Sequence, residues 1–133
     1  MKKTLLLALF IILVFGCARM QGKGTSDFTG TWLGSAENTG SDNPTFLLII
    51  EQKGSTISGI LTSMDGTFQK VSIVNAALNN GTLTFRAVSN GGDRYRGHIF
   101  DFSMNRNGEN IQGRWRDVLY GNQGSLTLTK QKE

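Results

Sequence analysis

The chain has 133 residues, with 14 basic and 10 acidic side chains, one cysteine and one histidine. This length fits one domain with a single core, and a lone cysteine excludes an intramolecular disulfide. Metal sites need several His, Cys, Asp or Glu side chains at ligand spacing. The sequence has no such cluster, so we expect neither a metal nor a cofactor.

The amino terminus has the pattern of an export signal. A basic start, Met1-Lys2-Lys3, precedes the apolar run TLLLALFIILVF over residues 4–15, and Gly16 is the small residue before Cys17. The run is shorter than the ~20 apolar residues of a membrane-spanning helix, so residues 1–16 are predicted to be a signal-peptide helix. Without Lys2 and Lys3, 12 basic side chains remain against 10 acidic ones, or about +2. We therefore expect no binding to nucleic acid.

The end of the signal carries a more specific motif. Val14-Phe15-Gly16-Cys17 resembles the bacterial lipobox, whose cysteine is acylated and becomes the first mature residue. The resemblance implies lipidation of Cys17, a membrane as partner through this anchor, and a location in the cell envelope. Ala18 favours the outer membrane by resemblance to enterobacterial lipoproteins. Several acyl chains would hold the protein firmly, because each buried methylene contributes about 0.8 kcal/mol. The alternative is an ordinary signal peptide with an incidental cysteine.

Residues 17–27 comprise the cysteine and the polar, glycine-containing stretch ARMQGKGTSD (18–27), which is typical of a flexible tether. From residue 28 to residue 131, apolar and polar side chains alternate between turn signals such as Asp65-Gly66 and Asn80-Gly81. No helical period is visible. The pattern predicts eight strands: Phe28–Ala36, Thr45–Lys53, Thr56–Ser63, Val71–Leu78, Thr82–Ser89, Arg94–Met104, Asn110–Val118 and Ser125–Gln131.

Short connections between these segments favour sequential pairing. The predicted fold is therefore all-β, an eight-stranded antiparallel up-and-down meander that closes into a small barrel, since closure removes exposed sheet edges. An open sandwich is the alternative. Side chains expected inside the barrel are Phe46, Ile50, Leu61, Phe85, Phe100 and Trp115.

Both tryptophans stand two residues after a glycine, in Gly30-Thr31-Trp32 and Gly113-Arg114-Trp115. Period 2 puts each glycine and tryptophan on one strand face, where small and large residues alternate to fill a barrel. The segments FTGTW, ISGILTS, RYRGHIFDF and IQGRW also resemble, in this order, strands one, three, six and seven of avidins, and FTGTW resembles the start of lipocalins. The resemblance implies a calycin-like barrel over residues 28–131. In lipocalins the first tryptophan packs near a basic residue of a late strand, a part that Lys130 could take. Biotin binding is not carried over, because only Trp115 occupies a comparable place.

The second half of the chain concentrates arginines, interleaved with Tyr95, Trp115 and Tyr120. Because arginine offers a bidentate fork to carboxylates, an anion-recognising rim is one interpretation. The other is that these arginines point outward and pair with Asp93, Asp101 and Asp117. The sequence has no nucleophile motif and no carboxylate pair at a diagnostic spacing. We therefore expect no enzymatic activity.

The expected function is that of a binding module, a monomer in the cell envelope that holds a small apolar or amphipathic ligand in the barrel mouth. The alternative is a protein-binding or enzyme-inhibitor lipoprotein that uses an Arg/Tyr surface rim. The candidate ligand-binding residues are Trp32, Arg94, Tyr95, Arg96, His98 and Trp115.

Overall fold

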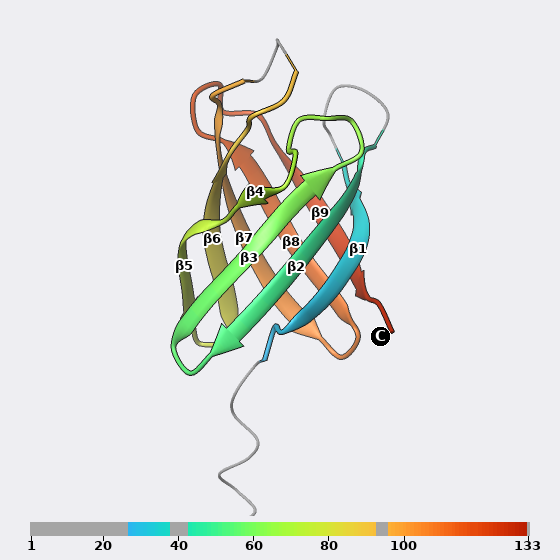
Figure 1. Ribbon diagram of the computed structural model, residues 1–133, viewed down its shortest axis with the longest axis vertical. Coiled ribbons are helices and arrows are strands. Elements are labelled where there is room, and N and C mark those ends of the chain that lie inside the picture. The colour runs from blue at the N-terminus through green and yellow to red at the C-terminus, as the bar shows by residue number, and fades with distance from the viewer. Residues whose placement is uncertain (1–26, 38–42, 93–95, 133) are drawn as a thin grey trace, which may run out of the picture.

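The computed structural model describes residues 27–37, 43–92 and 96–132, and their regular secondary structure is entirely β (Figure 1). The predicted signal-peptide helix, Cys17 and all of the tether but its last residue lie outside the described residues. The strands are β1 (Gly30–Ala36), β2 (Thr45–Lys53), β3 (Thr56–Ser63), β4 (Val71–Ser72), β5 (Val74–Asn79), β6 (Thr82–Val88), β7 (Ile99–Asn107), β8 (Asn110–Asp117) and β9 (Gln123–Lys130).

All nine strands belong to one antiparallel sheet, in the order β4-β3-β2-β1-β9-β8-β7-β6-β5. β1 pairs with both β2 and β9, so the first and last strands meet. A seam remains between β3 and β5, and the backbone N–H of Ile73 donates to the carbonyl of Gly59 across it (3.0 Å). The sheet is thus a nearly closed barrel (Figure 1). The predicted all-β antiparallel meander is confirmed, with nine strands in place of eight.

The additional strand arises where the chain crosses the seam. The predicted strand Val71–Leu78 is divided at Ile73, because β4 pairs with β3 on one edge and β5 pairs with β6 on the other. A register shift between Val74 and Ala77, with Asn75 at a φ of 54°, marks a β-bulge at this crossing. One straight strand cannot pair with both edges along its length, so the chain bends.

Three predicted strand starts also differ. β9 begins at Gln123 instead of Ser125, because its pairing with β8 extends to Arg116. β7 begins at Ile99 instead of Arg94, because Gly97 turns at a φ of 83° and its N–H donates to the carbonyl of Ser89 (2.9 Å). β1 begins at Gly30 instead of Phe28, and Phe28 lies beside it as a fully buried residue. A glycine with positive φ stands near the start of β1 and of β7: Gly30 is the first residue of β1, and Gly97 lies two residues before β7.

The barrel interior is filled by interlocking aromatic rings. All six side chains predicted to lie inside are buried. Phe85 stacks on Phe102 at a centroid distance of 4.9 Å, and Phe100 lies 6.1 Å from Trp115. Phe68, which lies in the connection between β3 and β4, adds a ring that touches three others: Phe46 at 5.9 Å, Phe100 at 5.2 Å and Phe102 at 6.1 Å. A loop residue therefore plugs one end of the core.

The two ends of the barrel differ in their connections. The end where residue 27 leads into β1 carries tight turns at residues 54–55, 80–81 and 108–109, and the C-terminus lies there too (Figure 1). The opposite end carries the longer connections β1–β2, β3–β4, β6–β7 and β8–β9. We call these the tether end and the loop end.

Candidate functional site

Trp32 lies at the tether end and is completely buried. Its indole N–H donates to the carbonyl of Phe28 (2.9 Å). Lys130 Nζ lies 6.0 Å and Arg106 Cζ 5.3 Å from the ring centroid, at distances that suit cation–π contacts. The contact predicted for Lys130 is present, and Arg106 adds a second cation that the sequence did not indicate. Trp32 therefore closes the tether end of the core, and its environment is structural.

Trp115 lies at the loop end, 6% exposed. Its indole N–H donates to the carbonyl of Glu37 (3.0 Å), which follows β1. A Cβ on Gly124, the residue paired with Trp115, would lie 2.6 Å from the indole nitrogen. The ring thus needs a glycine beside it. Since Trp32 and Trp115 occupy opposite ends, the structure does not bring these two predicted ligand residues together.

A hydrogen bond between an imidazole and a buried carboxylate organises the loop end. His98 Nδ1 lies 2.8 Å from Asp117 Oδ2, and Asp117 is 2% exposed. The other carboxylate oxygen, Oδ1, accepts hydrogen bonds from the backbone N–H of Leu119 (3.0 Å) and of Tyr120 (3.4 Å). The Tyr120 ring lies 4.8 Å from the imidazole. Asp117 therefore fixes the connection between β8 and β9 in one conformation.

Among the described residues Asp117 pairs with His98 and not with an arginine, contrary to one of the two interpretations of the sequence. Asp101 does pair with an arginine, Arg86, as that interpretation expects, and Asp93 lies outside the described residues.

Asp117 shares the inner face of β8 with Ile111, Gly113 and Trp115, because every second residue of a strand points the same way. This shared parity was the available signal for an inward carboxylate. Ser89 is close in space, but its Oγ accepts from the backbone N–H of His98 (3.1 Å) and the residue is 2% exposed. Ser89 thus offers no nucleophile to solvent.

Only one of the remaining predicted ligand residues lies in the described part of the chain. Arg96 is exposed at the loop end, whereas Arg94 and Tyr95 lie outside the described residues. Three large apolar side chains are exposed in the same loops: Met64 (68%), Leu119 (60%) and Tyr120 (69%). Met64 and Leu119 were missed, although apolar residues within turn-rich segments were the signal that could have found them.

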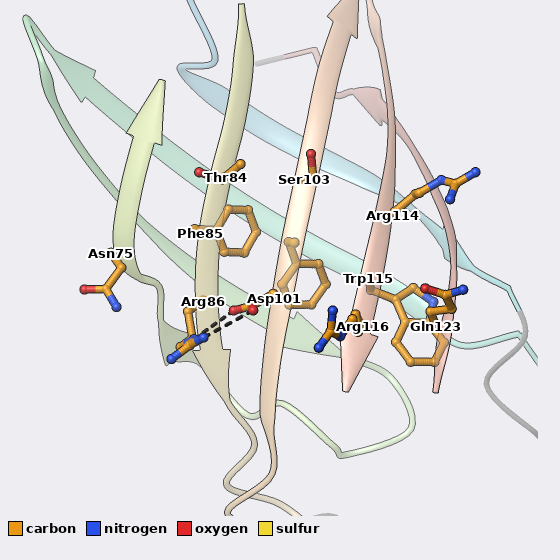
Figure 2. Close-up of a pocket in the computed structure, with 11 residues that line it drawn as sticks. Asn75, Thr84, Phe85, Arg86, Asp101, Ser103, Arg114, Trp115, Arg116 and Gln123 are labelled. Carbon is orange, nitrogen blue, oxygen red and sulfur yellow. Dashed lines mark hydrogen bonds and ion pairs between the residues drawn. The ribbon is translucent and has the colours of Figure 1, made fainter. Parts of the chain in front are cut away.

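The outer face of β6, β7, β8 and β9 carries an open groove of about 540 Å³ (Figure 2). Cross-strand pairing places Arg86, Asp101, Arg116 and Gln123 in one row near the loop end. The next row, two residues further along each strand, contains Thr84, Ser103 and Arg114. The aromatic residues between these positions, Phe85, Phe102 and Trp115, are buried and point into the core.

The charges in this groove are unevenly paired. Arg86 donates to both carboxylate oxygens of Asp101, at 2.7 and 3.2 Å. This hydrogen bonding lowers the pKa of Asp101, with a smaller contribution from the charge of Arg116, and it raises the pKa of Arg86. Arg114 and Arg116 form no ion pair within the part of the chain that the structure describes. Arg116 also stands opposite Asp101 in the β7–β8 register, so three arginines share one carboxylate and the groove keeps a net charge of about +2.

In the described ranges, no three His, Cys, Asp or Glu side chains are placed to hold a metal, and no helix is long and apolar enough to cross a membrane. No protein-family model matches this chain, and a comparison with curated proteins gives no significant match. The loop end and the groove are therefore the two surfaces whose geometry indicates a function.

Proposed function

We propose that the chain is a non-enzymatic cell-envelope lipoprotein that binds a protein partner through the loop end of its barrel. In this proposal acylated Cys17 anchors the protein, with the outer membrane as the expected location. The tether would join the barrel at the tether end, because residue 27 leads directly into β1 there (Figure 1). The loop end would then face away from the membrane, where a partner can reach it.

The observation that carries this proposal is an exposed apolar pair on a connection that is already ordered. Leu119 and Tyr120 are 60% and 69% exposed, while the buried carboxylate of Asp117 accepts from both of their backbone N–H groups. Aromatic side chains on a preorganised surface bind partners at low entropic cost. An exposed tyrosine on a fixed loop is therefore a suitable anchor for a protein partner.

The alternative function, a small apolar ligand in the barrel mouth, requires space among the core side chains. Phe46, Phe68 and Phe100 pack edge to face at the loop end, with centroids 5.2 and 5.9 Å from Phe68. This packing supports the protein-binding proposal over the small-ligand one. A fluorescent fatty-acid probe separates them, because a ligand in the mouth would quench Trp115 with saturable one-to-one binding.

Site-directed photo-cross-linking tests the protein-binding proposal. A photoreactive amino acid replaces Tyr120 in one variant and Ser58, which is exposed on β3, in the control. In intact cells we expect a cross-linked adduct of one discrete mass from position 120 and none from position 58. Adducts of equal yield from both positions, or none from position 120, would contradict the proposal.

The anchor has its own test. Mass spectrometry of the native amino-terminal peptide should show an acylated Cys17, and a Cys17→Ser variant should leave the membrane fraction. An unmodified Cys17 in the native protein would refute the lipoprotein assignment. The cross-linking at position 120 would still decide whether the loop end binds a protein.

A further inference from the structure

We propose that the groove on the outer face of β6–β9 binds an extended acidic peptide segment with carboxylates at positions i and i+2. The proposal rests on the proposed function for its choice of a protein as the source of the carboxylates. The ligand chemistry itself comes from the groove, and the two proposals can fail independently.

The charged side chains of the groove give the first support for this inference. Asp101 is already engaged by Arg86 through two hydrogen bonds, at 2.7 and 3.2 Å, so this pair forms a neutral wall. Arg114 and Arg116 are exposed on β8 and form no ion pair among the described residues. Arg86, Arg114 and Arg116 together face only one carboxylate, Asp101, so the groove has an excess of two positive charges. This excess favours a ligand that brings two negative charges.

The second step is spacing. Arg114 and Arg116 are two positions apart on one strand, so their Cα atoms lie about 7 Å apart and both side chains leave the same sheet face. An extended peptide has the same repeat, and acidic side chains at i and i+2 project about 7 Å apart on one side. Each carboxylate can therefore face one arginine fork, a geometry that a single carboxylate cannot satisfy.

The third step is shape. Thr84 and Ser103 are short side chains that pair across β6 and β7, in the same row as Arg114 and next to the row of Arg86 and Asp101 (Figure 2). They leave a hollow on a sheet face that long side chains would otherwise cover. A peptide that runs along β8, as the spacing of the two arginines requires, would have Ser103 on the neighbouring strand about 4.8 Å to its side. The hydroxyl group of Ser103 would then be available to the peptide backbone.

The groove is also continuous with the proposed protein-binding surface. Arg116 precedes Asp117, whose carboxylate holds Leu119 and Tyr120, and Gln123 begins β9 on the far side of the same connection. A partner that covers Tyr120 would thus bring a neighbouring acidic segment over the groove. The electrostatic part of this contact is expected to weaken with salt, because the arginines are exposed.

Calorimetric titration with synthetic peptides tests the inference, using the full chain in a non-ionic detergent. The probe is a capped Gly-Glu-Thr-Glu-Gly peptide, compared with a Gly-Gln-Thr-Gln-Gly peptide and with one whose two glutamates are three residues apart. We expect the first to bind at least fivefold more tightly than either comparison peptide, and to lose affinity in 0.5 M salt. Equal binding of the i,i+3 peptide would overturn the spacing argument, and no difference from the Gln peptide would overturn the inference itself.

Variants locate the binding. Arg114→Gln/Arg116→Gln should weaken the acidic peptide about tenfold, because two exposed charge pairs are lost. The matched control, Lys53→Gln/Lys132→Gln, removes two exposed positive charges elsewhere and should leave affinity within twofold. Equal losses in both would show a general effect of net charge and would refute the groove. If position 120 cross-links to a partner but calorimetry detects no binding of the acidic peptide, this inference alone is refuted. If the acidic peptide binds but position 120 gives no cross-link, only the proposed function is refuted.

Discussion

Phe68 gives the sharpest test of how the loop end is closed. The residue is 2% exposed and its ring packs edge to face against Phe46, Phe100 and Phe102, at centroid distances of 5.2 to 6.1 Å. Its backbone is fixed as well, since its N–H donates to Ser63 Oγ (2.9 Å) and its carbonyl accepts from the N–H of Ser63 (2.9 Å). Phe68→Ala would therefore leave a cavity among rings that are held in place from several strands.

The expected loss of unfolding free energy is about 3 kcal/mol, at the lower end of the range for buried Phe→Ala changes, because a loop residue lets its surroundings relax in part. In urea denaturation followed by tryptophan fluorescence, this loss moves the midpoint down by about 2 M for a slope of about 1.5 kcal/mol/M. Met64→Ala is the matched control, since Met64 lies in the same connection but is 68% exposed; its midpoint should change by the equivalent of less than about 0.5 kcal/mol. A Phe68→Ala loss below about 1 kcal/mol would refute the plug.

Three further expectations follow from other contacts. Asp117→Ala should lower the free energy of unfolding by about 2–4 kcal/mol, because it removes the partner of His98 and the acceptor for two backbone N–H groups. Faster amide exchange at residues 119–120 would report the released loop, and unchanged exchange would contradict the role of Asp117. Asp101 has a pKa lowered by Arg86, so its contribution to stability is present at neutral pH and is lost as pH falls below about 4, where the unfolded chain takes up protons first. Because the Asp101 side chain is 46% exposed, this contribution should stay under about 1 kcal/mol. Asp101→Asn should reduce the difference between the urea midpoints at pH 7 and pH 3. An unchanged difference would exclude the Arg86–Asp101 pair as its source. Gly34→Ala places a Cβ 1.8 Å from the carbonyl oxygen of Thr127, between β1 and β9, and should lower the free energy of unfolding by about 3 kcal/mol or more. The control Gly54→Ala has open space around its Cβ but a φ of 61°, and should lower it by only about 1 kcal/mol. Equal urea midpoints for the two variants would argue against tight closure between β1 and β9.

Local alternation in the sequence was sufficient to predict most of the sheet. In β6 the residues Leu83, Phe85 and Ala87 are all buried, and in β7 the same holds for Phe100, Phe102 and Met104. Period 2 determines these faces without knowledge of any partner strand. Asn80-Gly81 was likewise predicted as a turn, and both residues adopt positive φ, at 51° and 83°. Pairing of sequential strands followed from the short connections.

Part of the candidate site was also visible in the sequence. The arginines of β8 and the tyrosine after it were noted as a possible rim, and the Lys130 contact with Trp32 was expected from resemblance. Period 2 places Arg114 and Arg116 on the outer face of β8, opposite Trp115. What a single strand does not reveal is which residues stand beside these on the neighbouring strands.

Tertiary structure decided the rest. Closure of the sheet between β1 and β9 brought the two edges to a seam, and crossing this seam divided one predicted strand into β4 and β5. The barrel end left open by the strands was filled by Phe68, a residue with no strand pattern of its own. Register aligned Arg86, Asp101 and Arg116 across three strands. Alternation already places Asp117 on the inner face, but only the folded chain brings it to His98. The contacts of Arg86 with Asp101 and of His98 with Asp117 join residues 15 and 19 positions apart in the chain. Side-chain alternation sets which face of the sheet a residue occupies, but it does not set the neighbour on the next strand. Only the folded sheet therefore specifies these contacts.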